Sequence, residues 1–188
     1  MLVGLWMRGG IIPGLIYYGL GILSPKIFPL ATVIVCSIIS LSTGSSWSTM
    51  ATVGVAMMGI GNGLGIPPAL TAGIVVSGAY FGDKMSPLSD TTNLAPAVSG
   101  SSLFDHIRAM CWTTGPTYAI VAAITVIIGF RYAGGHLDTQ KIEALQLLMK
   151  TEFWISPIAF IAPAVVIVLS AMRKPALPSL YAGILVAV

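Results

Sequence analysis

Residues 77–96 hold the side chains of this chain that could do chemistry. Asp83, Lys84 and Asp90 fall within eight positions of this segment. Hydroxyl and amide side chains are interleaved with them, namely Ser86, Ser89, Thr91, Thr92 and Asn93. Apolar stretches of helical length lie on both sides, and a carboxylate at membrane depth usually faces a cavity, a partner or an ion pathway. The segment is therefore predicted to form an ion site.

The side chains of this segment offer oxygen atoms, which are the ligands that small hard cations such as Na⁺ prefer. The predicted ion-binding and proton-coupling residues are Asp83, Ser86, Asp90, Thr91, Thr92 and Asn93. A Na⁺ site is predicted within this set at Asp90, Thr91 and Asn93, completed by Ser46 from a second polar segment. Burial favours the neutral form of a carboxylic acid, so a proton and a sodium ion would compete for one carboxylate.

Two acids could carry this chemistry. Asp90 is preferred as the central acid because polar residues flank it at positions 89 and 91–93. Asp83 could instead form a buried ion pair with the adjacent Lys84 and so hold an unwound turn. The two carboxylates could also titrate as a coupled unit, in which case neither ionisation belongs to one residue alone.

The same segment is predicted to interrupt a membrane helix. Residues 69–98 resemble one span, but Gly82 weakens a helix and Pro87 removes a backbone donor. Irregular backbone at membrane depth is tolerated only where it is buried in protein or lines a wet cavity. We therefore predict a broken transmembrane helix over 69–98, with the polar residues at the break.

A second polar segment lies within residues 29–64. One short apolar run ends at Ser42, and another follows from Met50. Two short helices that meet at a polar turn predict a re-entrant hairpin, whose tip would present helix ends and hydroxyl groups to a ligand. The predicted tip residues are Thr43, Ser45, Ser46, Ser48 and Thr49. The alternative is two ordinary spans joined by a surface loop, with these hydroxyls acting as helix caps.

The composition is that of a membrane protein. Of the 188 residues, 56% are hydrophobic and 8% are charged, against roughly 25% charged in soluble domains. We therefore expect an all-α polytopic membrane protein with one membrane domain over 1–188. The formal charge of +3 is small and dispersed, which argues against a nucleic-acid partner. Cys36 and Cys111 lie in apolar runs without metal-type spacing and are expected to be buried thiols.

The other predicted elements follow the hydropathy pattern. They are a transmembrane helix at 1–23, an interfacial helix at 101–110, a transmembrane helix at 111–130, a polar loop at 131–152, a transmembrane helix at 153–172 and the start of a helix at 175–188. The last run has about 14 residues, short of the roughly 20 that a span needs. We therefore expect this chain to be part of a longer one.

Two segments carry a resemblance to a known family. Residues 43–49 (Thr-Gly-Ser-Ser-Trp-Ser-Thr) and 78–96 (Gly-Ala-Tyr-Phe-Gly-Asp-Lys-Met-Ser-Pro-Leu-Ser-Asp-Thr-Thr-Asn-Leu-Ala-Pro) resemble the NhaC-type Na⁺/H⁺ antiporter family, and the similarity extends loosely over the whole chain. The resemblance implies two inverted repeats, each with a re-entrant hairpin and a broken helix whose tips jointly hold the ion. One such pair is visible here, so the chain resembles about one repeat, and a second repeat is its expected partner.

The resemblance implies Na⁺/H⁺ antiport by alternating access across the cell membrane of a prokaryote, with no enzymatic step and no cofactor. Na⁺, H⁺ and the lipid bilayer are the expected partners, and a homodimer is expected by analogy with related ion transporters. Coupled exchange of a small carboxylate, of the malate/lactate type, is the alternative within the same family, because helix N-termini and hydroxyls also suit a carboxylate.

Two other classes fit the residues less well. An intramembrane aspartyl protease would use Asp83 and Asp90, but its chemistry needs two carboxylates about 3 Å apart that share a proton. Here seven positions separate the two acids, across a turn that contains a proline. A truncated assembly subunit without transport activity is the remaining alternative, and a reading frame that stops at Val188 would favour it.

Overall fold

The computed structural model describes residues 6, 8–133, 139–153, 155–156, 158, 161–172, 181–182 and 185. All regular elements in these residues are helices, which confirms the predicted fold class in its coarse, all-helical form. In chain order they are α2 (Ile11–Ile22), α3 (Phe28–Thr43), α4 (Ser46–Thr49), the π-helix η1 (Met50–Gly54), α5 (Val55–Gly63), α6 (Pro68–Met85), α7 (Asp90–Ser99), α8 (Leu103–Tyr132), α9 (Thr139–Glu152) and α10 (Ile161–Ala171).

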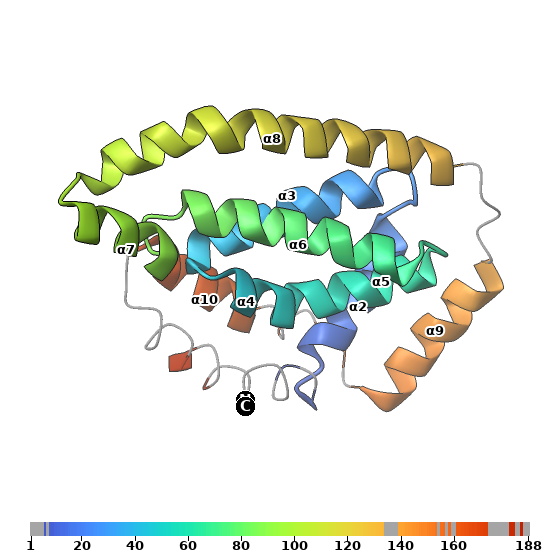
Figure 1. Ribbon diagram of the computed structural model, residues 1–188. Helices are drawn as coiled ribbons and strands as arrows, with labels where there is room; N and C mark the ends of the chain where they lie inside the picture. The colour runs from blue at the N-terminus through green and yellow to red at the C-terminus, as the bar shows by residue number, and fades with distance from the viewer. Residues whose placement is uncertain are drawn as a thin grey trace.

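Helices α3 and α6 form the centre of the molecule (Figure 1). They make the most extensive contact between any two of the described helices. The chain reverses direction after α3, and α4, η1 and α5 run back alongside α6. Helix α8 lies along α3 and α6, and α2 packs against α5. The pair of α3 and α6 therefore positions both polar segments.

A Gly-x-x-x-Gly pattern brings α6 against the backbone of α3. At Gly78 a Cβ atom would lie 2.5 Å from the carbonyl oxygen of Val33. At Gly82 a Cβ atom would lie 2.7 Å from the backbone nitrogen of Leu41 and would also meet the carbonyl oxygen of Ser37. Small residues at this spacing let two membrane helices approach closely. The two backbones are thus in direct contact where α6 approaches its polar end.

Serine side chains add hydrogen bonds to this helix pair. Ser37 Oγ donates to the Gly78 carbonyl over 3.1 Å, and Ser40 Oγ donates to the Ala79 carbonyl over 2.5 Å. The hydroxyl of Tyr118 on α8 lies 3.0 Å from Ser37 Oγ. Buried polar groups need such partners, and here they join three helices.

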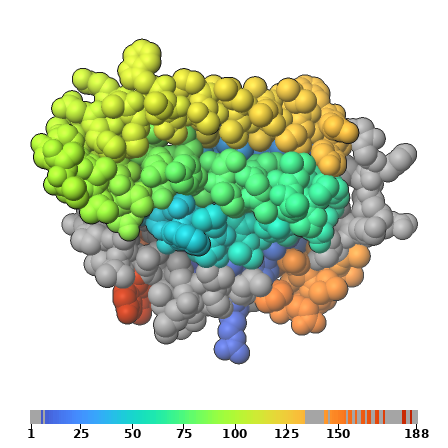
Figure 2. All heavy atoms as spheres, viewed as in Figure 1, coloured from blue at the N-terminus to red at the C-terminus, as the bar shows by residue number. Residues whose placement is uncertain are grey.

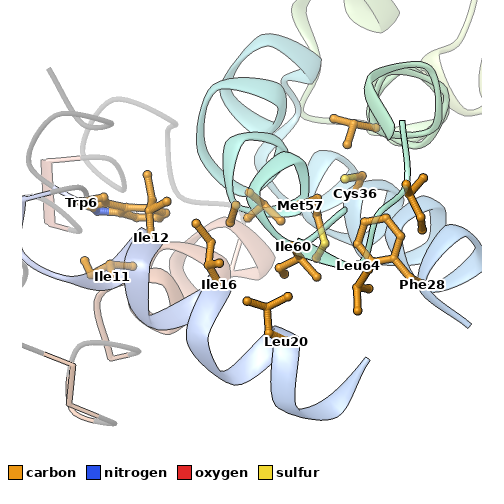
Figure 3. Close-up of a cluster of buried hydrophobic side chains, with 14 of the residues drawn as sticks. Trp6, Ile11, Ile12, Ile16, Leu20, Phe28, Cys36, Met57, Ile60 and Leu64 are labelled. Carbon is orange, nitrogen blue, oxygen red and sulfur yellow. The ribbon is translucent and has the colours of Figure 1, made fainter. Parts of the chain in front are cut away.

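The hydrophobic core lies between α2, α3 and α5 (Figure 3). Ile12 and Ile16 of α2 contribute to it together with Met57 and Ile60 of α5, and Phe28 at the start of α3 is completely buried. In a membrane such side chains stabilise the fold through close packing rather than through removal from water. This packing anchors α5, and through η1 it also holds α4.

Breaks between helices coincide with both polar segments. Helix α3 ends at Thr43 and α4 begins at Ser46, with Gly44 between them in the left-handed conformation. Helix α6 ends at Met85 and α7 begins at Asp90. How these elements lie relative to a membrane, as a re-entrant hairpin over 29–64 and a broken span over 69–98, stays a prediction.

Helix α8 differs from the expectation. Residues 101–110 and 111–130 are predicted as an interfacial helix and a separate span, but the structure joins them in one helix that also contains Pro116. A proline removes a single backbone donor, which a long membrane helix tolerates. Among the described residues α8 is the one helix that is long and apolar enough to cross a membrane, while α2 and α3 are shorter apolar helices. The expectation of a buried thiol was correct for Cys36 but wrong for Cys111, which is exposed, with its sulfur 3.9 Å from the sulfur of Met85.

The remaining predicted elements overlap the observed helices in part. Helix α2 covers the second half of 1–23, α9 covers most of the predicted loop 131–152, and α10 covers the second half of 153–172. Residues 1–5 and most of 175–188 lie outside the described residues.

Candidate ion site

Asp83 lies near the end of α6, and only 6% of its surface is exposed. Its two carboxylate oxygens accept separate hydrogen bonds. Ser46 Oγ donates to Oδ2 over 2.9 Å, and Ser89 Oγ donates to Oδ1 over 2.6 Å. Ser46 begins α4 and Ser89 immediately precedes α7, and both are buried. One carboxylate thus joins the two polar segments that the sequence singles out.

The turn between α3 and α4 positions Ser46. Gly44 has a φ of 69°, which glycine adopts without strain. A Cβ atom at Gly44 would lie 2.7 Å from the carbonyl carbon of Leu88, so this turn presses against the linker between α6 and α7. Ser45 then caps α4, because its side chain accepts a hydrogen bond from the N–H three residues later. The cap starts the helix with Ser46 opposite Asp83.

Hydrogen bonds hold the linker between α6 and α7. Ser86 Oγ donates to the carbonyl of Leu41 on α3 over 2.7 Å. Thr92 Oγ1 lies 3.1 Å from two carbonyl oxygens in the last turn of α6. Asn93 Nδ2 donates to two linker carbonyls over 2.8 and 2.6 Å. These three predicted site residues therefore fix the backbone around Asp83, and no group in the described part of the chain donates a hydrogen bond to Asn93 Oδ1.

The hydroxyls of Thr43, Ser45 and Thr49 in the predicted hairpin tip contact the backbone of their own segment. Thr49 Oγ1 donates to the Ser45 carbonyl over 3.0 Å, and Thr43 Oγ1 lies 3.5 Å from the same oxygen. Ser48 donates its backbone N–H to the cap of α4. All five tip residues lie in the described part of the chain, and Ser46 is the one whose side chain bonds to the buried carboxylate.

Asp90 is exposed at the first position of α7. Its Oδ1 atom accepts the N–H of Thr91 over 2.8 Å. A carboxylate at a helix N-terminus is stabilised by the helix dipole while it stays in solvent. The sequence favours Asp90 as the central acid and pairs it with Ser46, but the structure buries Asp83 and brings Ser46 to it. The reason is that α6 faces α4 at Asp83, whereas α7 starts outside that contact.

A hydroxyl pair connects the buried acid with the surface. Ser89 Oγ lies 2.9 Å from Thr91 Oγ1, and Thr91 is exposed. A carboxylate can only accept, so the Ser89 proton points to Asp83 and Thr91 is the donor to Ser89. The carboxylates of Asp83 and Asp90 therefore have separate partners, unlike the shared pair of an aspartyl protease.

Lys84 does not neutralise Asp83. Its ammonium lies over the ring of Tyr80, 5.4 Å from the centroid. In the described part of the chain, the hydrogen bonds to the Asp83 carboxylate come from the two serines, and no basic side chain forms an ion pair with it. Burial of a carboxylate is costly unless hydrogen bonds or an opposite charge offset the loss of water, and here two hydroxyls supply the hydrogen bonds. The alternative of a buried Asp83–Lys84 ion pair is therefore not what the structure contains.

Comparison of the sequence with known protein families assigns the chain to a family. A profile of the Na⁺/H⁺ antiporter family matches residues 78–188, which is more than half of the chain and includes Asp83, the linker and α7. The chain belongs to the Na⁺/H⁺ antiporter family. The resemblance to NhaC-type antiporters, noted at 43–49 and 78–96, is thereby confirmed, since two relatives carry that name.

Several known antiporters align with almost the whole chain. The malate-2H(+)/Na(+)-lactate antiporter of Bacillus subtilis is 48% identical over 184 residues, which are 98% of this chain and 39% of that protein. The Na(+)/H(+) antiporter NhaC of Alkalihalophilus pseudofirmus is 47% identical over 98% of this chain and 40% of its own. The arginine/ornithine antiporter ArcD of Halobacterium salinarum is 38% identical over 98% and 38%, respectively. The chain thus spans about two fifths of these relatives. No solved structure matches it.

Proposed function

We propose that the intact protein is a secondary active transporter that exchanges Na⁺ for H⁺ across the cytoplasmic membrane of a prokaryote, with Asp83 as the group that carries either ion. The observation that carries the proposal is the buried Asp83 carboxylate, which two serine hydroxyls contact and which lacks a basic partner among the described residues. Membership of the Na⁺/H⁺ antiporter family supports the choice of ions.

Competition between the two ions follows from the charge of this site. A proton on Asp83 removes the charge and leaves both hydrogen bonds with the serines available. Na⁺ would instead bind the ionised carboxylate, and rotation of the Ser46 and Ser89 hydroxyls would present their oxygen lone pairs to the cation. A proton or a sodium ion on Asp83 neutralises the buried charge, whereas both bound at once would leave a net positive charge. Exchange results if the site opens to either side in turn but never moves empty.

The exposed polar residues beside Asp83 suit a wider ion site in the intact protein. Asp90 and Thr91 are exposed, and no group among the described residues donates a hydrogen bond to the Asn93 amide oxygen. A second repeat of the hairpin and broken-helix type would supply further ligands to the cation and leave Asp90 in the wet approach to the site. In this arrangement Asp90 attracts cations towards the site, while Asp83 binds them.

We expect Ser46→Ala and Ser89→Ala to raise the Na⁺ concentration for half-maximal exchange by about tenfold each, because each removes one oxygen next to the carboxylate. Na⁺-driven proton movement, followed with a pH dye in vesicles that contain the intact protein, measures this. Ser42→Ala is the matched control, since the Ser42 hydroxyl donates to the carbonyl of Ile38 in its own helix. If the Na⁺ concentration for half-maximal exchange were unchanged in both site variants, the two serines would not contribute to ion binding.

Coupled exchange of a small carboxylate is the second candidate function. It is favoured by the 48% identity to a protein named as a malate-2H(+)/Na(+)-lactate antiporter. The two functions differ in what drives the proton. A Na⁺ gradient alone moves protons in the first case, whereas in the second malate and lactate must also be present on opposite sides of the membrane. Proton flux under each gradient in the same vesicles separates them.

A further inference from the structure

We infer that the hydroxyls of Ser89 and Thr91 form a proton relay, through which protons reach Asp83 and leave it. Helix α7, which carries Thr91, lies on the surface at one end of the molecule (Figure 2). Asp83 lies in the interior, with 6% of its surface exposed. The inference rests on the exchange proposed above and adds to it the path of one of the two ions.

The relay is continuous from the buried acid to the surface. Asp83 Oδ1 and Ser89 Oγ are 2.6 Å apart, and Ser89 Oγ and Thr91 Oγ1 are 2.9 Å apart. Both distances are those of O–H···O hydrogen bonds, along which a proton can pass. Ser89 is completely buried, whereas Thr91 is exposed. Bulk water therefore meets the relay at Thr91.

Both hydroxyls point inward while Asp83 is ionised. Ser89 donates to the carboxylate and Thr91 donates to Ser89, which leaves a lone pair of Thr91 Oγ1 for a protonated water molecule. When that water transfers a proton to Thr91, Thr91 passes its own proton to Ser89, and Ser89 passes its own to Asp83 Oδ1. Each hydroxyl forms one O–H bond and breaks one, and the carboxylate becomes neutral. Both hydroxyls then point outward, and the same steps in reverse return the proton to water.

The other oxygen of the carboxylate lacks such a connection in the described part of the chain. Asp83 Oδ2 accepts from Ser46 Oγ, and no described group donates to Ser46 Oγ in turn. Ser46 is itself buried, so this path ends after one hydroxyl. The buried hydroxyls of Ser86 and Thr92 donate to backbone carbonyls, which have no proton to pass on. The connected path to the acid therefore runs through Oδ1.

The charged side chains around the relay favour delivery of protons to its outer end. Asp90 Oδ1 accepts the backbone N–H of Thr91 over 2.8 Å, so an exposed carboxylate adjoins the outer hydroxyl. Negative charge at a surface raises the local concentration of cations, protonated water included. Lys84 holds its ammonium over the Tyr80 ring and takes no part in the hydrogen bonds of the relay. Asp90 thus assists the relay without being a member of it.

Thr91→Val tests the relay, because valine keeps the branched shape of threonine but has no hydroxyl. In vesicles that contain the intact protein, Na⁺-driven proton movement should fall at least about tenfold. Exchange of radioactive Na⁺ for unlabelled Na⁺ needs no proton and should change by less than about twofold. Thr91→Ser should restore proton movement, since serine supplies the same group. Thr117→Val is the matched control and should alter neither flux, because the exposed Thr117 hydroxyl donates to the Thr113 carbonyl in its own helix.

An equal loss of both fluxes in Thr91→Val would overturn the inference, since Thr91 would then support the shape of the site rather than the path of the proton. Unchanged proton movement in Thr91→Val would also overturn it and would leave the proposed exchange standing. If the unmodified protein exchanged Na⁺ for Na⁺ but moved no protons, the proposed exchange would be wrong, and the relay would be wrong with it.

Discussion

Asp83→Asn is expected to abolish Na⁺-dependent proton movement, with a loss of at least about 100-fold. The amide keeps the shape of the side chain and can still bond to Ser46 and Ser89, but it can neither bind a proton nor neutralise a cation. Proton flux and uptake of radioactive Na⁺ should therefore disappear together in vesicles that contain the intact protein. Insertion into the membrane should be retained, because the substitution removes a buried charge rather than adding one.

Asp90→Asn is the matched comparison for this variant. Asp90 is exposed, and an exposed charge contributes at most about 1 kcal/mol, so exchange should fall by less than about fivefold. Loss of exchange in Asp90→Asn with normal exchange in Asp83→Asn would reverse the assignment of the two acids. Asp90 would then be the central acid, as the sequence alone favours.

Gly82→Ala is expected to destabilise the protein by about 2–3 kcal/mol, a large effect for one methyl group. The new Cβ atom would lie 2.7 Å from both the backbone nitrogen of Leu41 and the Cβ of Ser40. Neither atom is the flexible end of a side chain, so α3 and α6 would have to move apart. The midpoint of thermal unfolding in detergent should fall by roughly 5–10 °C.

Gly73→Ala offers the same chemical change on the same helix. Nothing lies within 4 Å of a Cβ atom at Gly73, so the better helix propensity of alanine, up to about 1 kcal/mol, should appear as unchanged or increased stability. Equal unfolding temperatures for the two alanine variants would show that α3 and α6 do not depend on close backbone contact at Gly82.

The polar segments themselves could be predicted from the sequence. Both stand out because hydroxyls, amides and acids interrupt apolar runs, and glycine and proline mark the helix ends near Gly44 and Pro87. That Ser46 and Asp83 would come from those two segments follows from the same pattern. Their direct contact needs the packing of α4 on α6, which local patterns do not specify.

The choice between the two acids depends on which side of a helix faces a neighbour. Asp83 follows Gly82, whose position against α3 places that part of α6 in the interior. Asp90 begins a helix, where aspartate is common for local reasons. The Gly-x-x-x-Gly spacing was a usable signal for burial of Asp83. Ser89 carried no such signal, because the linker before α7 is irregular and the direction of its side chain depends on tertiary contacts.

The length of α8 could not be predicted for a related reason. Ser102 and Asp105 resemble a helix start, and Gly115 with Pro116 resembles a kink, so the pattern suggests two pieces. The structure continues through both signals. A local propensity for a break is overridden where the surrounding chain is strongly helical and packs against α3 and α6.

The π-helix η1 sets the rotation of the ion site relative to the core. It spans five residues between α4 and α5. Winding the same five residues as an ordinary α-helix would turn one side relative to the other by roughly a quarter turn, because a π-helix turns through fewer degrees per residue. Met57 and Ile60 pin the α5 side in the core, so the rotation would fall on Ser46. The wide turn of Met50–Gly54 thus sets the direction of a serine hydroxyl that lies outside it.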